Sequence, residues 1–207
     1  MNMKGEIKRK SLHLAAAAVP VALIHVPENI AVIPLVIFAL LNILMDRFKN
    51  QLPPLGRIYT FFFNDILRDH EKKGGFTGST CFFASLALSY AVFCVGLSMP
   101  VQWLAVIYTG FMLGDAAAAL AGKHMGSIVI FNGKTVEGSL AFVVVSFAST
   151  FWIMPDRIGL VFFASVMLCA AELILVHLDD NFFAPLFVMM VFYFTNICFA
   201  SVPGAGL

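Results

Sequence analysis

The chain has 207 residues, of which 60% are hydrophobic and 12% are charged, and its net charge at pH 7 is +1. A soluble globular domain averages about half apolar and one quarter charged residues, so this composition excludes an ordinary soluble domain. The mean hydropathy of +0.91 and the 22 phenylalanines indicate an integral membrane protein.

Seven apolar segments follow one another along the chain. They lie at residues 11–26, 30–45, 80–97, 101–121, 138–154, 158–177 and 182–201. A membrane-spanning helix needs about 20 apolar residues, and fewer where flanking side chains reach the interface. The first segment contains Pro20 and follows a basic stretch, so a signal peptide is the alternative to a retained helix. No small-residue cleavage site precedes a mature domain, and we expect a retained helix.

These segments predict an all-α polytopic membrane helix bundle with about seven transmembrane helices, built as a single integral membrane domain over residues 1–207. The basic residues fix the expected orientation. With a cytoplasmic N-terminus and an outside C-terminus, the inner segments are about 1–10, 46–79, 122–137 and 177–181. They hold 12 of the 13 lysines and arginines, as the positive-inside rule requires.

The polar clusters of the sequence fall on the cytoplasmic side in this topology. A transporter would more often place polar residues near the midplane of several spans. Clusters at one interface are expected where a cytosolic solute meets a lipid head, so we expect an active site on the cytoplasmic face. We expect a prokaryotic plasma membrane, or the endoplasmic reticulum in a eukaryote. Topology explains the basic residues, and we expect no nucleic acid as a partner.

The stretch GKT at 133–135 suggests a nucleotide-binding P-loop, but Ile128 stands where that motif requires its first glycine. A P-loop is therefore excluded. Lys134 remains a compact positive charge suited to a phosphate, with hydroxyls close by on Thr135 and Ser139. Glu137 follows at the start of a span. The alternative interpretation is an ordinary positive-inside loop followed by a helix cap.

Three acidic positions stand in or beside apolar spans. Asp115 lies inside the fourth span, where a carboxylate costs several kcal/mol and usually faces a protein interior or an aqueous pocket. Its small neighbours, such as Gly114 and Gly122, can admit a helix or a ligand closely. Asp179 and Asp180 separate the last two apolar segments. A structural ion pair is the alternative for Asp115.

The order of five short blocks carries a family resemblance. These are RKSLH (9–13), LRDHE…TGST (67–80), GDAAAALAGKHMG (114–126), NGKTVEGS (132–139) and E…LDDNFFAP (172–185). Over about residues 6–185 the chain resembles the polyprenol kinase family, which comprises dolichol kinase, phytol kinase and the CTP-dependent diacylglycerol kinases. The related phosphatidate cytidylyltransferases share the blocks at 114–126 and 132–139. Their longer, lysine-containing C-terminal signature is missing, because residues 158–207 hold no lysine.

The resemblance implies transfer of the γ-phosphate of CTP, with Mg²⁺ as cofactor, to a polyprenol, a phytol-like alcohol or diacylglycerol in the bilayer. Phosphoryl transfer needs carboxylates for a hard cation and cationic groups for the phosphates. We expect Mg²⁺ at Asp115, Asp179 and Asp180, and phosphate at Lys134 and Lys123. The hydroxyl proton would pass to Asp180 or Glu137. Further nucleotide contacts are expected from Arg9, Lys10, His13, Arg68, Glu71, Thr80, Thr135, Ser139 and Asn181. A cytidylyltransferase and a non-catalytic transporter or scaffold are the alternatives.

Overall fold

The computed structural model describes residues 11–12, 14–52, 67, 71, 74–131, 133–175 and 179–200, with side chains as far as Thr195. Its main helices are α2 (Ala18–Leu23), α3 (Glu28–Phe48), α6 (Gly78–Ser89), α7 (Val101–Met125), α8 (Val136–Thr150), α9 (Ile158–Ile174) and α10 (Asp180–Ala200). A π-helical turn, Tyr90–Gly96, continues α6, and short 3-10 turns at Phe151–Ile153 and Pro155–Arg157 connect α8 to α9. Each predicted apolar segment therefore contains a helix.

The protein is an all-α polytopic membrane bundle. Five helical segments are long and apolar enough to cross a membrane: Glu28–Phe48, Gly78–Gly96, Val101–Met125, Val136–Ile153 and Pro155–Ile174. Two shorter apolar helices, Leu14–Leu23 and Asp180–Thr195, complete the series among the described residues. The fold class is confirmed, whereas seven crossings and the orientation of the termini stay predictions.

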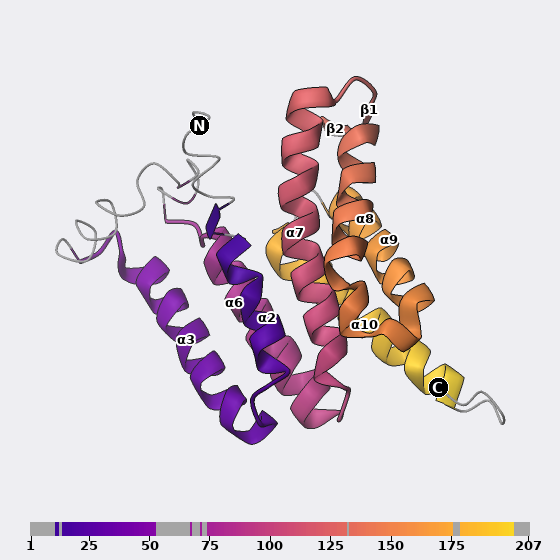
Figure 1. The fold of residues 1–207 in the computed structure, drawn as a ribbon. Coiled ribbons are helices and arrows are strands. Elements are labelled where there is room, and N and C mark those ends of the chain that lie inside the picture. The colour runs from indigo at the N-terminus through magenta and orange to yellow at the C-terminus, as the bar shows by residue number, and fades with distance from the viewer. Residues whose placement is uncertain are drawn as a thin grey trace.

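Helix α7 lies at the centre of the bundle. Figure 1 shows α2, α3 and α6 on one side of it and α8 and α9 on the other, and α10 contacts α6, α7 and α9. Most of the first half of α7 is buried, including Tyr108 and Phe111. Its 25 residues make a helix of about 37 Å, which is longer than a hydrocarbon core of about 30 Å. One end of α7 therefore extends toward or beyond the membrane surface.

Small residues at intervals of four let α8 approach α7 closely. A Cβ added at Gly110 would lie 2.6 Å from Oγ of Ser146, and one at Gly114 would lie 2.8 Å from the Phe142 ring. Further along, a Cβ at Gly122 would lie 3.2 Å from Oγ1 of Thr135. Small residues at such spacing are the usual way in which membrane helices pack backbone to backbone. The prediction that Gly114 and Gly122 admit a neighbouring helix is confirmed.

A hydroxyl chain links three helices inside the bundle. The Ser85 hydroxyl donates to the carbonyl of Phe182 at 2.7 Å, so it must accept from Tyr108, whose hydroxyl lies 2.7 Å away. Oγ of Ser89 lies 2.7 Å from the same Tyr108 hydroxyl. Hydrogen-bonded chains of buried groups satisfy one another and fix the register of the helices that carry them. The start of α10 is thus tied to α6 and α7.

A β-hairpin connects α7 to α8, where the sequence had suggested only a loop. Strand β1 (Val129–Phe131) pairs antiparallel with β2 (Lys134–Thr135). Gly133 has φ of 76°, a left-handed conformation that favours glycine, and it reverses the chain directly before Lys134. Oγ1 of Thr135 then accepts from the Gly138 amide at 3.2 Å and caps α8.

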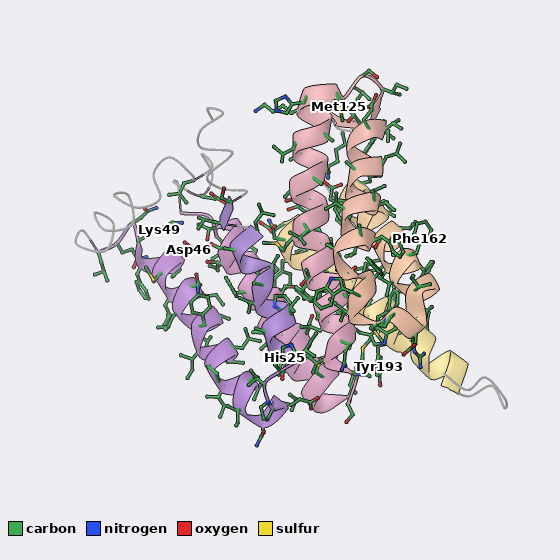
Figure 2. The ribbon with its side chains drawn as sticks, viewed as in Figure 1. His25, Asp46, Lys49, Met125, Phe162 and Tyr193 are labelled. Atoms are coloured by element: carbon green, nitrogen blue, oxygen red, sulfur yellow. The ribbon has the colours of Figure 1, made fainter. Side chains whose placement is uncertain are left out.

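The two ends of the bundle differ in what they carry. Figure 2 shows Met125, beside the hairpin, toward the same end as Asp46 and Lys49, whereas His25 and Tyr193 lie toward the other end. The hairpin and the Asp46–Lys49 pair therefore lie toward the same end of the bundle.

Candidate active site

A pocket of about 450 Å³ opens where the ends of α7, α8, α9 and α10 meet the hairpin. Its lining includes six residues that the sequence had singled out: Asp115, Lys123, Lys134, Thr135, Ser139 and Asp180. They come from three of the five blocks: two that are neighbours in the chain, 114–126 and 132–139, and the distant block 172–185. The predicted convergence of these blocks is therefore observed.

Small residues make the room for this pocket. Ala118, Ala119 and Gly122 line it from α7, and Gly138 lines it from α8. A Cβ at Gly138 would lie only 3.0 Å from the carbonyl oxygen of Ala118, so the backbones of α7 and α8 are in close contact here. Eight residues of helix separate Asp115 from Lys123, a rise of about 12 Å. A carboxylate and an ammonium group thus stand at different depths along one wall.

Lys134 is held by α9. Its Nζ lies 2.5 Å from Oε1 of Glu172 and donates to the backbone carbonyl of Glu172 at 2.6 Å. The Lys134 side chain is 25% exposed and that of Glu172 is 9% exposed. Spacing along the sequence gives no partner for Glu172. Glu172 joins the lining of the pocket and pairs with the lysine expected to bind phosphate.

The two aspartates at the start of α10 have different roles. Asp179 caps the helix, because its Oδ1 accepts from the Asn181 amide at 3.1 Å and its carbonyl accepts from Phe182 and Phe183. Asp180 lines the pocket, and its Oδ1 accepts from the side-chain amide of Asn181 at 3.1 Å. Asn181 is buried, and its side-chain amide orients Asp180. Neither Asp179 nor Asn181 is among the described residues that line the pocket.

Glu137 lies apart from the pocket lining. Its carboxylate accepts from the backbone and hydroxyl of Ser127, the first at 3.1 Å, and from the Ile128 amide at 3.5 Å. These bonds hold the turn between α7 and β1. The described residues therefore favour Asp180 over Glu137 as the carboxylate that meets a bound substrate.

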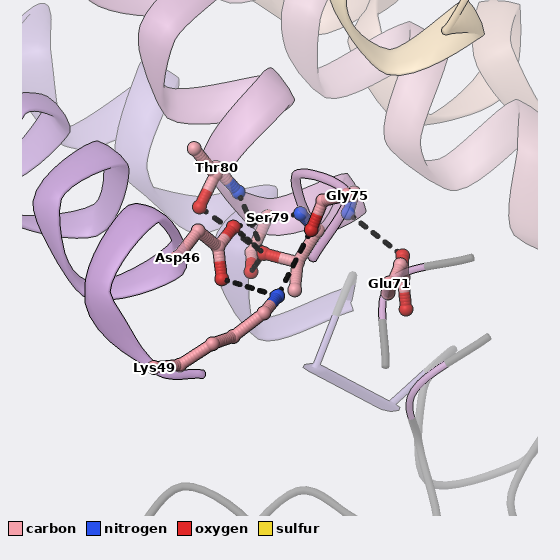
Figure 3. Close-up of polar contacts among 8 residues, drawn as sticks. Asp46, Lys49, Glu71, Gly75, Ser79 and Thr80 are labelled. Carbon is pink, nitrogen blue, oxygen red and sulfur yellow. Dashed lines mark hydrogen bonds and ion pairs between the residues drawn. The ribbon is translucent and has the colours of Figure 1, made fainter. Parts of the chain in front are cut away.

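Glu71 and Thr80 belong to a second polar cluster, which joins the end of α3 to the start of α6 (Figure 3). Oε1 of Glu71 accepts from the Gly78 amide at 3.1 Å, and the Thr80 amide donates to Oγ1 of Thr77, the cap of α6. Both predicted nucleotide contacts therefore stabilise a helix start, in a group that does not line the pocket.

Asp46 and Lys49 form the centre of that cluster, and the sequence interpretation missed both. Lys49 Nζ lies 3.1 Å from Oδ1 of Asp46 and donates to the Gly75 carbonyl at 2.9 Å. Oδ2 of Asp46 accepts from the amide and hydroxyl of Thr77 at 2.7 and 3.0 Å. The available signal was an acid and a base three residues apart at a helix end.

Four predicted nucleotide contacts lie outside the described residues: Arg9, Lys10, His13 and Arg68. Within the described part of the lining, Asp115, Glu172 and Asp180 face only two lysines. The three carboxylates line the same pocket and therefore share one neighbourhood. Acidic groups therefore outnumber basic ones in this described part of the pocket, and they repel the phosphates of a polyphosphate.

The described residues contain no group of three or more His, Cys, Asp or Glu side chains arranged to hold a metal ion. Mg²⁺ on a nucleotide does not need such a cage, because it is commonly bound by one or two carboxylates together with phosphate oxygens and water. Asp115 and Asp180 are carboxylates of one pocket, and this donor set fits such an ion.

Comparison with known proteins gives one partial match. Dolichol kinase of Saccharomyces cerevisiae is 34% identical over 113 residues, which are 52% of this chain and 19% of that protein. The chain spans about a fifth of the length of the dolichol kinase that it matches. No family model and no solved structure matches the chain. The match supports the resemblance to polyprenol kinases over about half of the chain.

Proposed function

We propose that this protein is a membrane lipid-alcohol kinase that transfers the γ-phosphate of CTP to a polyprenol or a related long-chain alcohol. The observation that carries the proposal is the gathering of Asp115, Lys134 and Asp180 in one pocket at an end of a membrane bundle. The 34% identity with a dolichol kinase supports the same reaction class. The neighbouring bilayer would supply the acceptor, whose chain needs only apolar surface.

The phosphate groups of the nucleotide meet the cationic part of the pocket. Lys134 and Lys123 are point charges suited to phosphate, and the Thr135 and Ser139 hydroxyls are short-range donors. Binding of this kind positions the γ-phosphorus and offsets its charge, which is most of what phosphoryl transfer asks of a protein.

Asp115 is the pocket residue that would hold Mg²⁺ on the nucleotide. The ion would neutralise charge on the β- and γ-phosphate oxygens. Because Asn181 orients Asp180 and Asp179 is engaged as a helix cap, we assign one pocket carboxylate to each of two tasks. Asp115 would hold the cation, and Asp180 would receive the proton of the alcohol.

The bond changes follow from these assignments. The alcohol oxygen forms a bond to the γ-phosphorus, and the bond from that phosphorus to the β,γ-bridging oxygen breaks. CDP leaves with the electron pair, and the hydroxyl proton passes to the Asp180 carboxylate. General-base catalysis by a positioned carboxylate contributes about 10²–10⁴-fold to a rate.

A cytidylyltransferase is the second candidate, since the block that carries Asp115 and Lys134 resembles that family too. Both are tested by incubating the purified protein in lipid vesicles with α- or γ-labelled CTP and a panel of polyprenol, phytol, diacylglycerol and phosphatidate. Label in lipid from the γ position alone, with an alcohol as acceptor, supports the kinase. Label from the α position, with phosphatidate as acceptor, supports the cytidylyltransferase and overturns our proposal.

A further inference from the structure

Glu172 makes two contacts with the same ammonium group. Nζ of Lys134 lies 2.5 Å from its carboxylate and bonds to its main-chain oxygen at 2.6 Å, across 38 residues of sequence. We propose that Glu172 is a positioning residue: it fixes Lys134 in the pocket wall so that the ammonium can bind a nucleotide phosphate. This inference rests on the proposed function, because the phosphate site that Glu172 makes rigid is the one assigned to the kinase.

The main-chain contact has a simple cause. Glu172 lies in the last turn of α9, where carbonyl oxygens lack partners within the helix and carry its negative dipole end. A lysine ammonium that reaches this turn donates a hydrogen bond to one of these oxygens and also interacts favourably with the helix dipole. The carboxylate adds the second contact, and an ammonium group has three donors, so one remains for a phosphate.

The exposures of the two side chains fit a binding role better than a purely structural one. The carboxylate of the pair is buried, whereas the lysine is 25% exposed and lines the pocket. A lysine has four flexible carbons and loses considerable entropy when it is ordered. The contacts with Glu172 order the Lys134 side chain before a nucleotide binds, so this entropy is not lost on binding. Pre-organisation of this kind raises affinity.

Charge alone predicts the opposite effect. Glu172 shares the pocket with Asp115 and Asp180, so its negative charge repels a polyphosphate. If charge dominated, neutralising Glu172 would strengthen CTP binding. If positioning dominates, removing the carboxylate weakens binding, and an amide oxygen that still accepts from Lys134 preserves much of it. The two effects therefore differ in sign.

The experiment measures CTP binding by calorimetry, and separately KM and kcat, on the full-length protein in nanodiscs. The variants are Glu172→Gln, Glu172→Ala, Lys134→Ala and the double variant, with Asp156→Asn as a control. Asp156 is a carboxylate of the turn before α9 and does not line the pocket. Loss of a hydrogen bond to a charged group predicts an increase in the CTP Kd of about 10- to 100-fold in Glu172→Ala.

We expect Glu172→Gln to lie between Glu172→Ala and wild type, and Asp156→Asn to match wild type. Since Glu172 acts through Lys134, Glu172→Ala should add almost no further loss to Lys134→Ala. Equal or tighter CTP binding in a folded Glu172→Ala protein, or additive losses in the double variant, would overturn the positioning role and leave the kinase proposal standing. Transfer of label from the α position of CTP would overturn the kinase proposal. The non-additive effect of Glu172→Ala and Lys134→Ala on CTP binding would still support the positioning role.

Discussion

The buried ion pair between Asp46 and Lys49 allows a stability prediction that does not depend on the enzymatic proposal. Asp46 is 2% exposed and accepts from Lys49 and twice from Thr77, so Asp46→Ala removes three polar contacts at once. It also leaves the ammonium of Lys49, itself 4% exposed, without its carboxylate. Removing one partner of a buried pair costs about 3–5 kcal/mol.

For a chain of this size, that loss corresponds to a fall in the unfolding temperature of roughly 6–20 °C. The assay is thermal unfolding of the purified protein in one detergent, followed by helical circular dichroism. The matched control is Arg47→Gln, which removes an exposed charge from the neighbouring residue of α3. Replacing both partners, as in Asp46→Leu with Lys49→Met, should recover part of the loss because no buried charge is left alone. An Asp46→Ala protein that unfolds at the temperature of the Arg47→Gln control would refute the reasoning.

Three further predictions follow from the pocket and from the packing beside it. Lys134→Ala should abolish turnover while the protein stays folded. Lys134→Arg should have low activity too, because a forked guanidinium does not replace a compact ammonium. Transfer of labelled phosphate to lipid measures the activity, and circular dichroism checks the folding. Asp115→Asn should raise the Mg²⁺ concentration for half-maximal rate, and CTP should bind much more weakly in EDTA; equal CTP affinity with and without Mg²⁺ would remove the cation from the mechanism. Gly114→Ala should cost about 1–3 kcal/mol of stability through overpacking against Phe142, with partial recovery by Phe142→Leu in thermal unfolding.

Local patterns were sufficient to predict the helices. Each apolar segment became a helix because a lipid-facing chain must satisfy its backbone internally. The small residues around Asp115 also had a readable spacing, and the structure uses them as close contacts between α7 and α8. The convergence of Asp115, Lys134 and Asp180 followed from topology, since each lay near the same predicted end of its span.

Side-chain partners could not be predicted from spacing. Glu172 and Lys134 are 38 residues apart, and their meeting depends on the hairpin that follows α7. Asp179 and Asp180 are neighbours with equal chemistry, yet only the second faces the pocket because α10 starts between them. An aspartate directly before a helix is a recognised cap signal, so that division was available in principle.

Asp46 and Lys49 were missed for a different reason. The apolar stretch ends at Met45, so the sequence predicts that residues 46–79 form a segment outside the membrane. Helix α3 instead continues to Phe48, because the buried Thr77, which caps α6, donates to Asp46 in the last turn of α3. Tertiary contacts thus extended a helix beyond its hydrophobic pattern.

The most direct test of the central claim is the transfer of γ-phosphate from CTP to a polyprenol, measured side by side for wild type and Asp180→Asn in identical vesicles. The substitution keeps the shape of the side chain and removes its capacity to accept the alcohol proton. We predict labelled lipid from wild type and a rate about 10²–10⁴-fold lower from an equally folded Asp180→Asn protein. No labelled lipid from wild type, or equal rates from the two proteins, would contradict the claim that this pocket is the site of phosphoryl transfer.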